Sequence, residues 1–188
     1  MKESHDNWIP RAREKFPGLQ PSEVQLCENI ISGRPADYRV DSSNTESKRL
    51  NNPQSADDWG PDRTLGAEVV TWLCETSKLW NPVGGGVIEI RSAKIDGELR
   101  LDNVSIDVVL RFLHCSIQGT IFLRNATLRT IDLEGTYLFP TTVTHNDPAV
   151  IDSDCKRATW CIKATEAEIN GSVRLKDGFR AFRNGQLR

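Results

Sequence analysis

The segment Cys115-Ser-Ile117-Gln-Gly119-Thr-Ile121-Phe-Leu123 carries the pattern that decides the fold of this chain. A small residue, an isoleucine, a glycine and two more aliphatic residues occupy every second position. Residues 93–101 (AKIDGELRL) and 167–175 (AEINGSVRL) repeat this frame, and residues 104–112 (VSIDVVLRF) repeat it with valine in place of glycine. An apolar period of two is typical of an extended strand with one buried face, so the pattern excludes a helix here.

The units begin 11 residues apart between residues 93 and 123, so that a pair of units takes 22 residues. Turn-forming pairs, Asp102-Asn103 and Arg124-Asn125, separate them. A chain that bends at a fixed interval and then returns into register stacks its strands about 4.8 Å apart. The sequence therefore predicts a mainly β fold, a β-helix (β-solenoid) with apolar residues in internal columns. The predicted core residues are Ile88, Ile90, Ile95, Leu99, Leu101, Ile106, Leu110, Ile117, Ile121 and Leu123.

Residues 126–140 resemble pentapeptide-repeat proteins. The segments ATLRT, IDLEG and TYLFP follow one another as three consecutive five-residue units. The earlier units alternate five with six residues, so a coil of 22 residues is longer than one built of pentapeptides alone. The resemblance implies a right-handed β-helix with stretched faces.

The chain is expected to divide into two parts. Residues 1–81 form an N-terminal helical cap that includes a long polar loop at residues 39–58. Residues 82–188 form the β-solenoid, which an insertion rich in turn-forming residues interrupts at about residues 141–157.

Two helices are expected in the cap. A capping box at Ser22-Glu-Val-Gln25 and a terminal Gly33 indicate the first helix. An apolar stripe that includes Leu65, Val69 and Leu73 indicates the second, at about residues 62–77. We expect the second helix to cover the first coil, where a bare strand edge would otherwise pair with another chain.

The N-terminal third carries a second resemblance. The segments PSE at 21–23, GRPADY at 33–38, DWGPDRT at 58–64 and AEVVTWL at 67–73 precede the repeats. In this order they resemble a bacterial group of uncharacterised proteins, some loosely labelled membrane-associated oxidoreductases. The resemblance covers about residues 19–138 and implies kinship rather than activity, because no redox cofactor motif can be placed on residues of this chain.

Composition narrows the classes of partner and the compartment. The net charge of −2 gives no reason to expect a nucleic-acid partner, and no apolar run approaches the roughly 18 residues that a membrane span needs. The N-terminus is too polar for a secretory signal. Five cysteines without a CxxC pair fit reduced, mostly buried thiols. A cytoplasmic location without a bound cofactor is the expectation.

The insertion holds the candidate metal ligands His145, Asp147, Asp152 and Asp154. Their spacing fits neither a zinc motif nor a calcium loop, and a solvated loop is the competing interpretation. If three or four of these side chains converge, the chain is a metal-dependent hydrolase or oxidoreductase that uses residues 141–161. A nucleophile pair of Cys115 with His114 is not expected, because adjacent side chains of a strand point to opposite faces.

The other candidate function is protein binding. Phe122 should face outward one coil above Arg100, and Arg124 should lie over Asp102. Residues 181–188 resemble a unit that stops halfway, which points to a longer chain or to a partner that covers this end, with Leu187 in the contact. The primary hypothesis is thus a non-catalytic interaction or assembly module that binds a protein partner, or itself, through its C-terminal end.

Overall fold

The structure of the protein is a computed structural model. It describes all residues except 1–7, 41–44, 81–85, 141–160, 184–185 and 188, and it describes only the backbone of 45–47, 182–183 and 186–187. Its helices are α1 (Trp8–Lys15), α2 (Pro21–Ile31), α3 (Thr45–Leu50), α4 (Ala67–Glu75) and α5 (Ser77–Trp80), with 3-10 helices η2 (Pro53–Asp58) and η3 (Pro61–Arg63).

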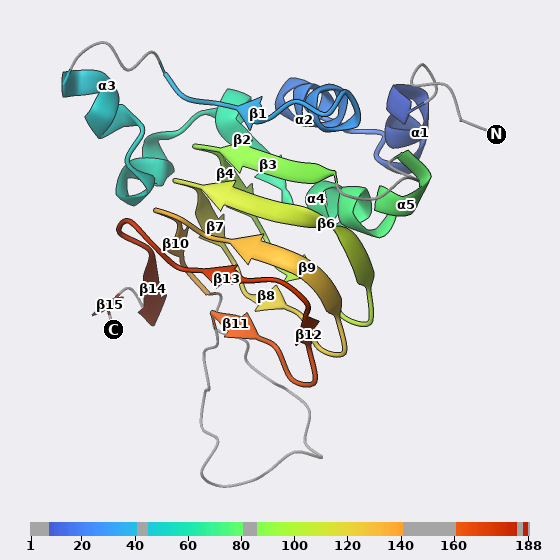
Figure 1. Ribbon diagram of the computed structural model, residues 1–188. Coiled ribbons are helices and arrows are strands. Elements are labelled where there is room, and N and C mark those ends of the chain that lie inside the picture. Colours follow the sequence, from blue (N-terminus) through green and yellow to red (C-terminus); the bar gives the residue numbers. More distant parts are fainter. Residues whose placement is uncertain (1–7, 41–44, 81–85, 141–160, 184–185, 188) are drawn as a thin grey trace, which may run out of the picture.

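The strands form three sheets (Figure 1). The first sheet contains, in spatial order, β1 (Ala36–Asp37), β3 (Val87–Arg91), β6 (Ser105–Leu113), β9 (Thr127–Asp132) and then both β12 (Glu168–Ile169) and β13 (Val173–Arg174). The second contains β2 (Thr64–Gly66), β4 (Lys94–Asp96), β7 (Ser116–Gln118), β10 (Tyr137–Leu138), β14 (Arg180–Arg183) and β15 (Gln186–Leu187). The third contains β5 (Leu99–Arg100), β8 (Ile121–Phe122) and β11 (Ile162–Lys163). Among the described strands, all neighbours are parallel except β14 and β15.

The 22-residue spacing of the sequence reappears as the register of these sheets. Ile88 pairs with Leu110, Ile95 with Ile117 and Leu99 with Ile121. Side chains of one column therefore stack on one another, and all ten predicted core residues are at most 2% exposed. These core predictions are confirmed.

The bends between strands recur at residues in the left-handed region. Asn103 (φ 59°) and Asn125 (φ 50°) occupy one such place, and the side-chain amide of Asn125 donates to the side-chain oxygen of Asn103 at 3.0 Å. Ser92 (φ 51°) and His114 (φ 52°) occupy another. Asparagine tolerates this conformation better than most residues, so the turn-forming pairs of the sequence lie where bends are required.

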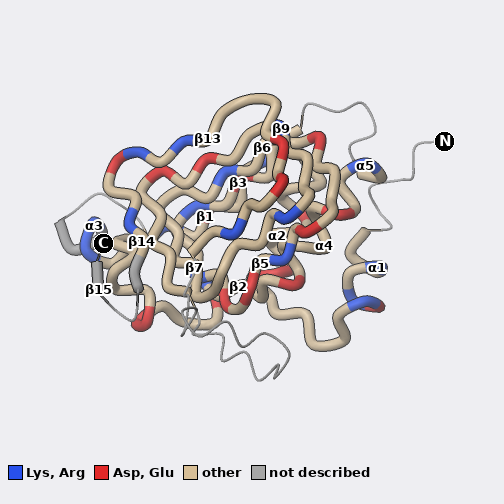
Figure 2. The backbone as a smooth tube through the Cα atoms, turned by 90° about the horizontal axis from the view of Figure 1, so that it is seen from below, with Lys and Arg blue, Asp and Glu red and all other residues tan. Residues whose placement is uncertain are grey.

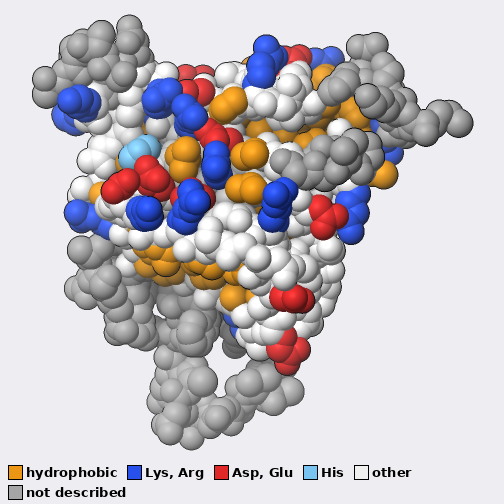
Figure 3. All heavy atoms as spheres, in the orientation of Figure 1, with side chains coloured by type: hydrophobic (Ala, Val, Ile, Leu, Met, Phe, Trp, Pro, Cys, Tyr) orange, Lys and Arg blue, Asp and Glu red, His pale blue; other side chains and the backbone are white. Residues whose placement is uncertain are grey.

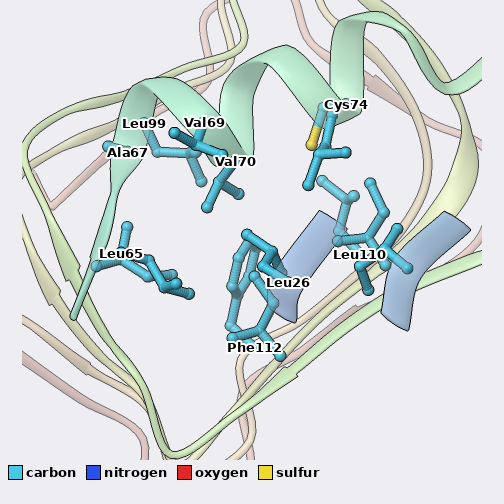
Figure 4. Close-up of a cluster of buried hydrophobic side chains, with 14 of the residues drawn as sticks. Leu26, Leu65, Ala67, Val69, Val70, Cys74, Leu99, Leu110 and Phe112 are labelled. Carbon is cyan, nitrogen blue, oxygen red and sulfur yellow. The ribbon is translucent and has the colours of Figure 1, made fainter. Parts of the chain in front are cut away.

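The predicted fold class, a mainly β right-handed β-helix with an N-terminal helical cap, is wrong. The structure is an α/β fold in which three mostly parallel sheets and the helices share one core. Leu26 of α2 and Val70 and Cys74 of α4 are fully buried in the cluster that also contains Leu110 and Phe112 (Figure 4). The alternating pattern revealed the strands because they repeat, whereas each helix occurs once and contributes to the core through tertiary packing.

The N-terminal third also supplies strands to two of the sheets. β1 pairs with β3, and β2 pairs with β4 (Figure 1). The helix predicted at residues 62–77 therefore begins late: residues 64–66 are extended, and α4 starts at Ala67. The physical reason is that the backbone of residues 64–66 gains a neighbouring strand, which local apolar spacing does not reveal.

Two other local predictions need correction. The predicted capping box at Ser22–Gln25 is wrong, because the first helix begins at Pro21 and its capping contact joins Gln20 to Glu23. The backbone N–H of Gln20 donates to the Glu23 carboxylate at 2.8 Å. The end of this helix at Gly33 (φ 70°) agrees with the prediction. The polar region at 39–58 contains α3 and η2 rather than loop alone.

Candidate interaction surface

Phe122 is the centre of an aromatic and basic group on the outer side of the third sheet. The centroid of its ring lies 4.7 Å from the guanidinium carbon of Arg100 and 5.8 Å from the guanidinium carbon of Arg124. Register places Arg100, Phe122 and Lys163 side by side on β5, β8 and β11. The predicted position of Phe122 one coil above Arg100 is confirmed. The ring remains partly accessible, so this group offers flat apolar area edged by cations.

Acidic side chains hold both arginines of this group. Arg100 pairs with Glu98, and Arg124 donates to Asp102 through its Nη2 atom at 2.7 Å and through its backbone N–H at 2.8 Å. These hydrogen bonds from Arg124 lower the pKa of the Asp102 carboxyl against the opposing effect of its burial. The predicted contact between Arg124 and Asp102 is confirmed, and it keeps the cations next to Phe122 in place.

A second charged feature crosses the first sheet. Glu89, Arg111, Asp132 and Arg174 occupy one column on four successive strands, β3, β6, β9 and β13. Arg111 lies 3.2 Å from Glu89, and Arg174 lies 3.8 Å from Asp132. We call these four residues the charge ladder. Figure 2 shows basic and acidic positions across these strands, and Figure 3 shows the charged side chains gathered on this face.

Beside the end of the ladder lies an apolar surface that we call the end face. Its residues come from the last strands of the first and third sheets and from the adjoining bends; they are Ile162, Ala167, Ile169, Val173, Leu175 and Phe179. Val173 is 49% exposed and Leu175 is 48% exposed. The partners of Val173 in the same column, Ile131, Leu110 and Ile88, are at most 2% exposed. A side chain of core type is therefore open to solvent at this end.

The helices lie at the opposite end of the sheets. In Figure 1, α1, α2, α4 and α5 gather near β1, β2 and β3, whereas β11, β12 and β13 lie at the far end. Figure 3 shows a band of hydrophobic side chains below the charged row. At the helical end, the helices bury their own apolar side chains, such as Leu26 and Leu73, which are both 0% exposed. No described helix lies over the end face.

The other sequence-predicted site residues fall elsewhere. His145, Asp147, Asp152 and Asp154 lie outside the described residues. Within the described part of the chain, no group of three or more His, Cys, Asp or Glu side chains converges as a metal site would. Leu187 lies in β15, which turns back antiparallel to β14, so the last residues do not continue the parallel repeat.

Cys115 and His114 separate as the sequence predicted. Cys115 is fully buried and His114 is exposed. Burial raises the pKa of the Cys115 thiol to about 12 despite hydrogen bonds that lower it. A thiol with such a pKa is almost entirely protonated at neutral pH, which makes it a poor nucleophile.

Arg63 is a buried cation that sequence reasoning missed. Its guanidinium donates to the backbone oxygens of Ser92, at 2.8 and 3.1 Å, and of Leu50, at 3.1 Å, and it lies 3.8 Å from the Trp59 ring centroid. Burial lowers the pKa of Arg63. A cavity of about 200 Å³ adjoins it, and its lining includes both arginines and acids: Val40, Arg49, Leu50, Ser55, Asp58, Trp59, Gly60, Asp62 and Arg63. The hydrogen bonds of Arg63 connect the segment around η2 to the bend at Ser92. Because the cavity lining carries both positive and negative charges, it favours no class of ligand.

Sequence reasoning also missed the end face, although four of its residues, Ala167, Ile169, Val173 and Leu175, belong to the repeat unit at 167–175. The frame of 167–175 is the same as that of 115–123, and nothing in it marks the last strand of a sheet. The feature of the sequence that could have pointed to this surface is its charge pattern, in which Glu166 and Glu168 precede Arg174 and Lys176.

No protein-family model, curated protein or solved structure gives a significant match to this chain. Among the described residues, no helix is long and apolar enough to cross a membrane.

Proposed function

We propose that this protein is a non-catalytic interaction or assembly module that binds a protein partner through its end face. One observation carries the proposal. In the column of Ile88, Leu110 and Ile131, exposure rises from at most 2% to 49% at Val173. Large apolar side chains in a row at the edge of a sheet are typical of a protein contact.

The backbone at this end suits the same use. β12 and β13 of the first sheet and β11 of the third are the last described strands of their sheets. Strand edges present N–H and C=O groups that an incoming strand can pair with, while its side chains fill the adjacent apolar positions. Main-chain hydrogen bonds would thus supply affinity, and the end face would supply apolar burial.

The Phe122 group lies on the adjoining outer side of the third sheet. Lys163 belongs to β11 and is the neighbour of Phe122 in register, so the group reaches the last strand of that sheet. Protein interfaces commonly place apolar residues at the centre and polar residues at the rim. Phe122, Arg100 and Arg124 would form such a rim.

We place this function in the cytoplasm. Cys27, Cys74 and Cys115 are buried free thiols. Thiols that remain unpaired are typical of a reducing compartment.

The test compares capture by matched bait proteins. Wild type, Leu175→Glu and Leu79→Glu are tagged and used to capture proteins from lysate of the source organism. Leu79 lies in α5, is 53% exposed and is matched in type and exposure to Leu175. Loss of a stoichiometric partner from Leu175→Glu alone is the expected result, with circular dichroism to show that both variants fold. Equal capture by all three baits would contradict the proposal.

A further inference from the structure

We infer that the partner at the end face is a second copy of this chain, related by a two-fold axis that passes near Gly171. β12 and β13 would pair antiparallel with their own counterparts. This inference rests on the proposed function and names the partner that the same surface takes. It is carried by three features of residues 168–174: their charges, their apolar side chains and the backbone groups that face away from β9.

The charge ladder indicates what the next strand must carry. From β3 to β13 its signs alternate, with Glu89, Arg111, Asp132 and Arg174 in turn. Arg174 is the last member, and its side chain is 49% exposed whereas that of Asp132 is 5% exposed. A strand that continues the ladder therefore needs an acidic residue opposite Arg174.

The last strands themselves supply that residue when they are turned antiparallel about Gly171. This register sets Glu168 of each copy opposite Arg174 of the other, and Ile169 opposite Val173. Glu168 is exposed and forms no ion pair with any described residue. Cross-strand pairs of opposite charge and of aliphatic residues stabilise antiparallel strands. Both ladders would continue, and the apolar column would be covered.

Side-chain direction agrees with this register. Glu168 and Arg174 pair with Thr127 and Asp132 of β9, on the outer side of the sheet. Ile169 and Val173 pair with Leu128 and Ile131, which are at most 2% exposed and point into the core. Directly opposite residues of an antiparallel pair share a face, so charged residues would meet outside and aliphatic residues inside.

The backbone hydrogen bonds agree as well. Toward β9, the N–H groups of Glu168 and Asn170 donate to Ala126 and Leu128, at 2.8 and 2.9 Å. The C=O groups of Ser172 and Arg174 accept from Ile131 and Leu133, at 3.1 and 2.9 Å. A bend at Asn170 and Gly171 separates β12 from β13. Within each strand adjacent residues direct their backbone groups to opposite sides, so those of Ile169 and Val173 face away from β9. Opposite each other across the two-fold axis, these two residues can exchange both hydrogen bonds of an antiparallel pair.

The register also sets the spacing of the ion pair. Positions next to a hydrogen-bonded pair are non-hydrogen-bonded pairs, whose Cα atoms approach to about 4.5 Å. Glu168 and Arg174 fall at such positions. A two-fold interface uses the same surface twice, so one chain supplies both of its halves.

Complementary charge reversal tests the inference. Wild type, Glu168→Arg and Arg174→Glu are compared by sedimentation velocity over a range of concentrations, with circular dichroism of each. We expect wild type to dimerise and each variant to raise the dimer Kd at least about tenfold, since like charges then face each other at both ends of the pair. An equimolar mixture of the two variants should form a 1:1 heterodimer, because both arginines of one variant then face both glutamates of the other. Arg129→Glu is the control, since Arg129 is an exposed residue of β9 outside the last strands.

The other possible outcomes contradict either the antiparallel register or the second copy as partner. A dimer that persists in both variants, or variants that fail to associate when mixed, rules out the antiparallel register about Gly171. Wild type that remains monomeric rules out the second copy as partner. In that case the capture comparison of Leu175→Glu with Leu79→Glu still decides the proposed function, because it detects a different protein at the same surface.

Discussion

The carboxylate of Glu23 in α2 accepts a 2.8 Å hydrogen bond from the backbone N–H of Gly66, the residue that precedes α4. Its other oxygen accepts from the N–H of Gln20, which precedes α2. Glu23 is 7% exposed. One buried acid thus satisfies a backbone donor at the N-terminus of two helices, where negative charge is also favoured by the helix dipoles.

Replacing Glu23 with Gln should lower the free energy of unfolding by about 2 kcal/mol, because hydrogen bonds to a charged acceptor are stronger than those to a neutral one. The amide also brings an N–H group toward one of the two donors. Urea denaturation measures the loss. Glu68→Gln is the control: Glu68 is exposed in the first turn of α4 and should change stability by less than about 0.5 kcal/mol. Equal effects of the two changes would show that the buried contact is unimportant.

An aspartate at Ile117 should abolish cooperative folding. Ile117 is 0% exposed in the second sheet between Ile95 and Leu138, so its replacement buries an unpaired charge. The expected loss exceeds about 4 kcal/mol. Leu79→Asp introduces the same charge at an apolar position of α5 that is 53% exposed, and it should cost less than about 1 kcal/mol. Thermal melting followed by circular dichroism separates the two; a stable Ile117→Asp protein would refute the register.

Alanine at Gly119 should be destabilising although the side chain added is a single methyl group. A Cβ atom there would lie 2.2 Å from the backbone oxygen of Gly97 on the neighbouring strand segment. Because backbone cannot move aside as a side chain can, we expect a loss of about 1–3 kcal/mol. Gly18→Ala is the matched change, since a Cβ at Gly18 meets nothing within 4 Å. Urea denaturation of both proteins should show a loss only for Gly119→Ala.

Asp102→Asn should make the protein less stable at neutral pH but not at low pH. The hydrogen bonds from Arg124 lower the pKa of folded Asp102, so the contact contributes fully above the unfolded pKa of about 3.9. Its contribution is lost as pH falls through the lower folded pKa. We expect wild type to exceed the variant by about 0.5–1 kcal/mol at pH 7, and this difference to shrink below about pH 4.

Urea denaturation at a series of pH values measures this difference. Asp107→Asn serves as the comparison, because Asp107 lies 3.6 Å from Lys78 with both side chains more than half exposed. Such a pair is worth little. A difference between wild type and Asp102→Asn that stays constant down to pH 2 would contradict the role of the Asp102 carboxylate.

The strands of the repeated units, their 22-residue register and the core residues within them could be predicted from the sequence alone. Residues such as Ile117 and Ile121 recur with a period of two in repeated units, and repetition makes a local pattern unambiguous. The contacts of Arg100 with Phe122 and of Asp102 with Arg124 followed from the same register, because a shift of 22 residues places one side chain on the next.

The fold class and the exposure of the end face depend on tertiary contacts. Thr64–Gly66 became a strand, and Val70 and Cys74 entered the common core, through neighbours that lie far away in sequence. Likewise, Val173 has the same local pattern as Ile121, yet one is 49% exposed and the other 0%. Local sequence specifies which face of a strand is apolar, whereas burial depends on whether another strand or helix lies against that face.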